Sequence, residues 1–116
     1  MPRNWKNKPE DNTGRLLEFE EQSPAYAAAI EIKPNANETF IEVGQLTGPL
    51  ALTADVTLAQ KWDKVRLSFN ADGTARTVTP GTGINAVDVV VAINGKATLS
   101  LMFDGTEFVE TGRYVQ

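Results

Sequence analysis

The sequence predicts an all-β fold: an antiparallel β-sandwich or small barrel of about seven or eight short strands, preceded by an extended N-terminal arm. Three observations support this prediction. Apolar and polar residues alternate along short runs, as in strands that bury one face. Pairs of turn-forming residues separate those runs at spacings of roughly 8 to 12 residues. No stretch has the periodicity of a long helix.

The region from 63 to 113 contains the strongest strand signals. The run 65–70 alternates strictly, and Asp72-Gly73 follows it directly. Because Asp-Gly pairs suit the φ > 0 positions of tight turns, we expect the chain to return antiparallel through 77–79. The sequence therefore predicts a first hairpin at Asp72-Gly73.

Two further turn pairs predict two further hairpins. Asn94-Gly95 lies between the apolar run 87–93 and the alternating run 99–103. Asp104-Gly105 then leads into the last apolar run of the chain. Together with the first hairpin, these turns predict an antiparallel meander over the second half of the chain.

The preceding segments are shorter and interrupted by proline and glycine. Residues 25–33 alternate and end before Pro34, which favours a strand over a helix. The run 40–43 predicts the next strand, and 50–52 predicts another. Residues 56–58 fit either a strand or a single helical turn.

The N-terminal segment 1–23 differs in composition from the domain predicted for 24–116. It is rich in charged residues, asparagine and proline and has few apolar anchors. One interpretation is a terminus that no partner orders. The other is an extended arm that gains structure by lying on another subunit, because exposed aromatic residues are typical of interfaces. Its apolar contacts would be Trp5, Leu16, Leu17 and Phe19.

Composition excludes several classes of function. The 116 residues contain no cysteine and no histidine, which excludes disulfides, the usual zinc sites, Ser-His-Asp triads and Cys-His dyads. The net charge of −4 disfavours a phosphate-binding surface, so nucleic acid is not an expected partner. No apolar run has the roughly 20 residues of a membrane span, and the N-terminus lacks the apolar core of a signal peptide. We expect a soluble protein that is retained in the cell that makes it and has no membrane partner.

Acidic pairs do not predict a catalytic site. Glu107 and Glu110 are an odd number of positions apart on one predicted strand, so they should point to opposite faces. Asp104 with Glu107, or Asp72 with Asp104, could bind calcium, but aspartates in these positions more commonly stabilise turns. The glycine-rich loop 79–83 lacks the lysine and helix of a phosphate-binding loop. We predict no catalytic residue, no cofactor and no metal site.

Two apolar features each allow two interpretations. Trp62 lies in a polar connector, where it could cap the core through its indole N–H or serve as a stacking platform for a sugar. The run 87–93 is apolar on both faces, so its strand should be central in a sandwich or covered by a neighbouring subunit. The second interpretation predicts an oligomer.

The segments 64–79, 81–83 and 99–111, with their repeated Asp-Gly-Thr turns, resemble small β-sandwich modules of tailed bacteriophage virions. Such modules occur in capsid decoration proteins and in fibre or spike proteins, and the similarity covers roughly residues 52–113. The resemblance implies a non-enzymatic virion component, often trimeric, and gives no functional residues to transfer. This chain has no long fibrous shaft and its arm is short, which fits a capsid cement protein better than a receptor-binding fibre.

The expected function is therefore a capsid decoration protein, made in the host cytoplasm and located on the capsid surface. Its partners would be the lattice of the major capsid protein and other copies of itself, with a trimer favoured. The alternative is a tail-fibre, receptor-binding or carbohydrate-binding module that uses Trp62.

Overall fold

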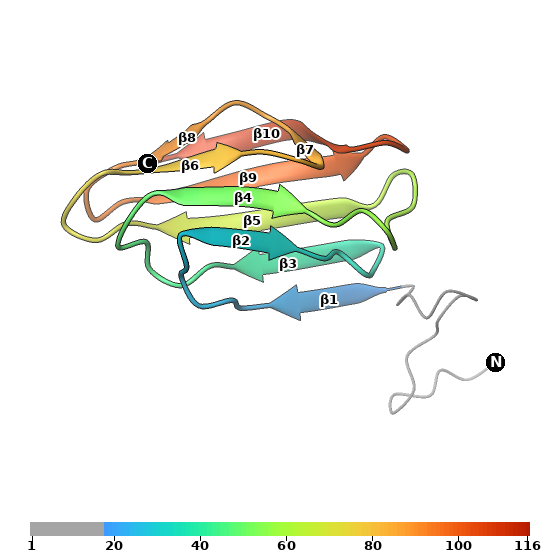
Figure 1. Cartoon of the computed structure of the whole chain (residues 1–116), viewed down its shortest axis with the longest axis horizontal. Helices are drawn as coiled ribbons and strands as arrows, with labels where there is room; N and C mark the ends of the chain where they lie inside the picture. The colour runs from blue at the N-terminus through green and yellow to red at the C-terminus, as the bar shows by residue number, and fades with distance from the viewer. Residues whose placement is uncertain (1–17) are drawn as a thin grey trace.

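The computed structural model describes residues 18–116, which form ten strands and no helix (Figure 1). The strands make two facing sheets, one of six strands in the order β1-β3-β5-β9-β10-β7 and one of four in the order β2-β4-β6-β8. The prediction of an all-β fold is confirmed, with more strands than expected. Their bounds are β1 Phe19–Gln22, β2 Ala29–Ile32, β3 Glu38–Glu42, β4 Leu50–Ala54, β5 Lys64–Asn70, β6 Arg76–Pro80, β7 Ile84–Asn85, β8 Val89–Val91, β9 Lys96–Phe103 and β10 Phe108–Val115.

The path of the chain is solenoid-like. From β1 to β8, every odd strand lies in the six-stranded sheet and every even strand in the four-stranded sheet. As a result β1, β3 and β5 pair in parallel, and so do β2, β4 and β6. Both sheets are mixed, because β8, β9 and β10 add antiparallel pairs. The prediction of an antiparallel sandwich is wrong for the first six strands, which coil around the core.

Two of the three predicted hairpins are also wrong. The Asp72-Gly73 turn carries the chain from β5 in one sheet to β6 in the other. Asp72 accepts a hydrogen bond from the backbone N–H of Thr74 at 3.2 Å and is paired with Arg76, with Arg76 Nε 2.9 Å from Asp72 Oδ1. The Asn94-Gly95 turn likewise joins β8 to β9 across the two sheets, with Asn94 at φ 53°.

The Asp104-Gly105 hairpin is confirmed. Gly105 has φ 105°, and β9 and β10 pair antiparallel on either side of the turn. The Asp104 carboxylate accepts hydrogen bonds from the backbone N–H groups of Thr106 at 2.8 Å and Glu107 at 3.0 Å. These hydrogen bonds, that from Glu107 first, hold the pKa of Asp104 below its usual value. The aspartate therefore stabilises the turn.

The predicted strands of the first half are confirmed at 29–32, 38–42 and 50–54. Residues 56–58 form a turn, closed by the N–H of Ala59 donating to the carbonyl of Val56 at 3.1 Å. The strand alternative for this segment is wrong.

The core lies between the two sheets. Each strand contributes alternate residues, so β5 buries Val65, Leu67 and Phe69 and β9 buries Leu99 and Leu101. This alternation leaves the other face of each sheet exposed to solvent. The outer faces and the sheet edges are therefore the surfaces available to partners.

A β-bulge in β10 places an ion pair on the inner side of the sheet. The register shifts between Glu110 and Gly112, so Glu110 is opposite Leu101 and Arg113 is opposite Leu99, both buried. Arg113 donates to Glu110 at 2.6 and 2.7 Å and to the backbone carbonyls of Val87 and Asp88 at 2.9 Å each. It thus ties the segment before β8 to β10.

This ion pair predicts a loss of stability in acid. The hydrogen bonds from Arg113 lower the pKa of Glu110 below its ordinary 4.5. A lowered pKa in the folded state contributes stability above pH 4.5, and that contribution is lost as the pH falls through the folded-state value. We expect Glu110→Gln to lower the free energy of unfolding by about 1 kcal/mol at pH 7. Urea titrations should show this difference shrinking as the pH falls below 4.5, whereas a difference independent of pH would contradict it.

Candidate interaction surfaces

Three surface features of residues 18–116 are candidates for function: the outer face of the six-stranded sheet, the outer side of β8, and Trp62. Each exposes apolar or aromatic side chains that the fold itself does not bury. Large exposed apolar groups that lie together are typical of binding surfaces.

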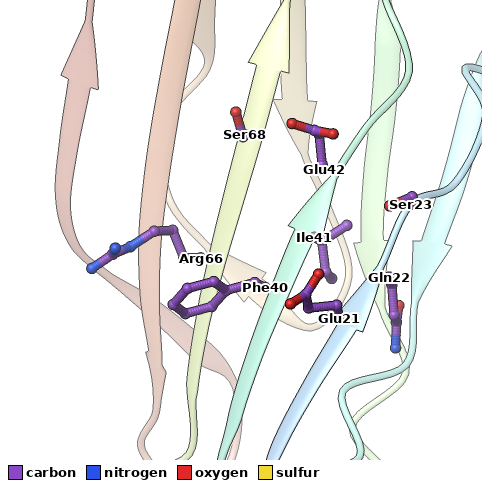
Figure 2. A pocket seen from close by; sticks show the side chains of 8 residues that line it. All are labelled: Glu21, Gln22, Ser23, Phe40, Ile41, Glu42, Arg66 and Ser68. Atoms are coloured by element: carbon purple, nitrogen blue, oxygen red, sulfur yellow. The ribbon is translucent and has the colours of Figure 1, made fainter.

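Phe40 and Arg66 lie side by side near the centre of the outer face (Figure 2). They are register partners on the parallel strands β3 and β5, so their side chains leave the sheet at the same level. The guanidinium of Arg66 lies 5.2 Å from the centroid of the Phe40 ring, and the ring of Phe19 meets Phe40 edge-on at 4.8 Å. These contacts fix the orientation of Phe40, whose side chain nevertheless stays 39% exposed.

Hollows lie on both sides of Arg66. One, of about 260 Å³, is lined by Glu21, Phe40 and Glu42 on its acidic side and by Arg66 and Ser68 opposite (Figure 2). A second, of about 350 Å³, extends over β9 and β10, where Gly112 leaves the surface without a side chain. The face is therefore uneven, with acidic residues towards β1 and basic residues on β5.

Three exposed apolar residues lie in or beside β8: Val87 before the strand, Val90 within it and Ile93 after it, and we call them the β8 rim. Their exposed fractions are 71%, 55% and 61%. Val89 and Val91 between them are buried, and β8 is the edge strand of the four-stranded sheet. The prediction that this strand is central is wrong, and its alternative, a strand covered by a neighbouring subunit, stays a prediction.

Trp62 does not cap the core. Its side chain is 63% exposed and its backbone has φ 78°. The backbone N–H of Trp62, not the indole, donates to the carbonyl of Phe103 at 2.8 Å. The ammonium of Lys61 lies 4.9 Å from the ring centroid. A left-handed conformation is unusual for a bulky residue. The stacking role predicted for Trp62 is untested.

The predicted arm falls mostly outside the described residues. Trp5, Leu16 and Leu17 lie in the part of the chain that the structure does not describe. Phe19 begins β1, which pairs with β3, so the last part of the predicted arm belongs to the sheet of its own chain. Its role in binding a partner stays a prediction.

Of the two acidic pairs considered for calcium, Asp104 and Glu107 lie in one turn that the Asp104 carboxylate stabilises, and Asp72 and Asp104 are not brought together. Asp72 follows the end of β5 and Asp104 follows the end of β9, and these antiparallel neighbours place the two at opposite ends of the sheet. Within residues 18–116, no group of three or more His, Cys, Asp or Glu is placed to hold a metal ion. The same residues include no helix long and apolar enough to cross a membrane.

Comparison with protein-family models and with curated proteins finds no match for this sequence. The candidate surfaces are therefore assigned from their geometry and chemistry alone.

Sequence reasoning missed the Phe40–Arg66 contact. The two residues are 26 positions apart and meet only because β3 and β5 pair in parallel at this register. The only local signal is that both occupy polar-face positions of alternating strands, and at such a position a phenylalanine is out of place.

Proposed function

We propose that this chain is a non-enzymatic capsid decoration protein that binds the outer surface of an assembled capsid and stabilises it. Two arguments support the proposal: the resemblance of its turn-rich segments to virion modules, and the bare β8 rim. The rim is the stronger argument because it is based on the exposure of individual side chains, whereas the resemblance is a pattern of turns.

An uncovered apolar edge strand is a liability in an isolated protein. Edge strands usually carry charges or proline, or are covered, because open backbone groups and apolar side chains invite association. The β8 rim instead presents two valines and an isoleucine, and Asp88 is the one charged residue in the segment 87–93. A surface of this kind is stable in water when a partner covers it. We assign that role to a subunit of the major capsid protein.

The fold holds the rim in a fixed position. The guanidinium of Arg113 donates hydrogen bonds to the backbone carbonyls of Val87 and Asp88. The buried side chains of Val89 and Val91 anchor β8 in the core. A rigid surface loses little conformational entropy on binding, which favours affinity. Stabilisation then follows from mass action: a protein that binds only the assembled shell shifts the equilibrium towards that shell.

The variant Val90→Lys tests the rim. Placing a charge at the centre of a buried apolar contact should weaken co-sedimentation with assembled shells of the cognate major capsid protein by about tenfold or more. Ala29→Lys is the matched control, because it adds the same charge at an exposed position of β2, the opposite edge strand of the same sheet. If Val90→Lys binds as well as the unmodified chain and Ala29→Lys binds more weakly, the contact does not involve the rim.

The arm is tested separately. Because β1 starts at Phe19, a truncation that tests the arm without disturbing the sheet must end at residue 17. In the same assay, loss of binding on removal of 1–17 would assign a second contact to the arm. Retained binding would leave the rim as the contact and count against the arm.

A carbohydrate-binding module is the second candidate, and the exposure and left-handed backbone of Trp62 favour it. Under this alternative, Trp62→Ala should lose binding to a glycan array that the unmodified chain retains. Under the capsid proposal, the same variant should bind assembled shells as well as the unmodified chain does.

A further inference from the structure

The outer face of the six-stranded sheet has a charge pattern that is complementary to itself. Paired residues lie at the same level along the strands, so the face reads as three rows across β1, β3, β5 and β9. The rows are Phe19, Glu38, Lys64, Met102; then Glu21, Phe40, Arg66, Ser100; then Glu42, Ser68, Thr98 on the last three strands. Acidic residues occupy β1 and β3, and basic residues occupy β5.

No ion pair among the described residues uses the charges on this face. The ion pairs found among residues 18–116 are Lys33–Asp55, Arg76–Asp72 and Arg113–Glu110, all elsewhere. Glu38 and Lys64 are exposed neighbours in register, yet neither is in an ion pair in the described part of the chain. Arg66 contacts the ring of Phe40 and has no carboxylate partner among the described residues. An exposed set of unpaired charges of both signs suits a partner with the reverse arrangement.

We propose that two copies of this chain bind face to face through this surface, around a two-fold axis that runs parallel to the strands between β3 and β5. Such an axis lays β3 of one copy over β5 of its partner, and β1 over β9. A two-fold contact uses the same patch on both copies, so each pairing occurs twice.

This arrangement makes the first two rows complementary. Glu38 of each copy faces Lys64 of the other, and Phe19 faces Met102. In the next row Phe40 faces Arg66, so that each guanidinium lies between two aromatic rings, and Glu21 faces the hydroxyl of Ser100. Facing sheets of this kind pack about 10 Å apart with strands near −30°.

The second copy is a better occupant than an unrelated protein because the match follows from the register of this chain alone. An axis placed one strand further, between β5 and β9, would put Arg66 over Ser100 and leave Glu38 without a basic partner. The overlap of four strands is on the order of 20 Å by 20 Å. This is small for a stable dimer, so association should depend on concentration. The inference gives a pair, whereas the resemblance implies a trimer.

Charge exchange tests the inference in the absence of any capsid shell, so its outcome is independent of the proposed function. Sedimentation equilibrium of the full chain should show a monomer–dimer equilibrium that weakens with added salt. Glu38→Lys and Lys64→Glu should each weaken dimerisation by about tenfold or more, because each creates two like-charge contacts. The double variant should return the dissociation constant to within about threefold of the unmodified chain.

Glu31→Lys is the matched control. It makes the same change of charge at an exposed position of β2, on the outer face of the other sheet, and should leave dimerisation unchanged. Circular dichroism of each variant confirms that it is folded. A chain that stays monomeric at millimolar concentration, a trimer, or a double variant no better than the two single variants would overturn the inference.

Discussion

Phe69→Ala is expected to lower the free energy of unfolding by about 4 kcal/mol, because it removes a large, fully buried ring from the core. Phe69 is fully buried near the end of β5, and its register partner on β9 is Ala97. Because Ala97 is small, its side chain cannot fill the space that the ring leaves. The cavity would therefore stay open, which places the cost in the upper part of the usual range.

Chemical denaturation measured by circular dichroism checks this prediction. Tyr114→Ala is the control, because it also removes an aromatic ring from the six-stranded sheet but at a position 61% exposed. It should cost less than about 1 kcal/mol. Equal effects of the two substitutions would mean that the space between the sheets is not the core.

Gly83→Ala is expected to destabilise the fold by about 3 kcal/mol. Gly83 has φ 84°, and a methyl group there would clash with the carbonyl oxygen of Ala54. The same glycine accepts a hydrogen bond from the N–H of Phe108 at 2.9 Å, and Thr82 beside it accepts one from Ala54 at 2.9 Å. It therefore lies where the chain crosses from the four-stranded sheet to β7, and neither side can move without losing a hydrogen bond.

Gly73→Ala provides a control of the same chemistry. A methyl group at Gly73 would meet no atom within 4 Å, and its backbone is not left-handed. Replacing a glycine at such a site is neutral or slightly stabilising, because it restricts the unfolded chain. Thermal unfolding should therefore separate the two alanine variants clearly. A Gly83→Ala protein as stable as Gly73→Ala would contradict the described crossing.

The strands could be predicted from the sequence because each buries one face. Val65, Leu67 and Phe69 alternate with polar residues whether the neighbouring strand is parallel or antiparallel. Alternation therefore located β5 and β9, and the Asp104-Gly105 turn located the hairpin that follows β9. The same pattern carries no information about which strand pairs with which.

The solenoid-like path could not be predicted because its coils differ in length. Phe19 pairs with Glu38 and Glu38 with Lys64, so register partners on successive strands of this sheet are 19 and 26 positions apart in the sequence. In the other sheet Ala29 pairs with Ala51 and Ala51 with Thr79, which gives 22 and 28. Unequal coils leave no fixed repeat in the sequence. The Asp-Gly and Asn-Gly pairs then favoured hairpins over crossings between sheets.

The candidate surfaces were only partly visible in the sequence. The run 87–93 predicted a strand that is either central in a sandwich or covered by a neighbouring subunit. The structure places β8 at a sheet edge and leaves the three residues of the β8 rim exposed. The rows on the six-stranded sheet depend on the parallel register of β1, β3 and β5, which local patterns do not encode. We propose that both surfaces act through contact with other protein chains.

Co-sedimentation with the cognate major capsid protein tests the central claim most directly. The unmodified chain should pellet with assembled shells and stay in the supernatant with unassembled subunits, because a decoration protein binds the assembled lattice. It should also raise the temperature at which the shells dissociate. Equal binding to shells and free subunits, or no binding to either, would contradict the account.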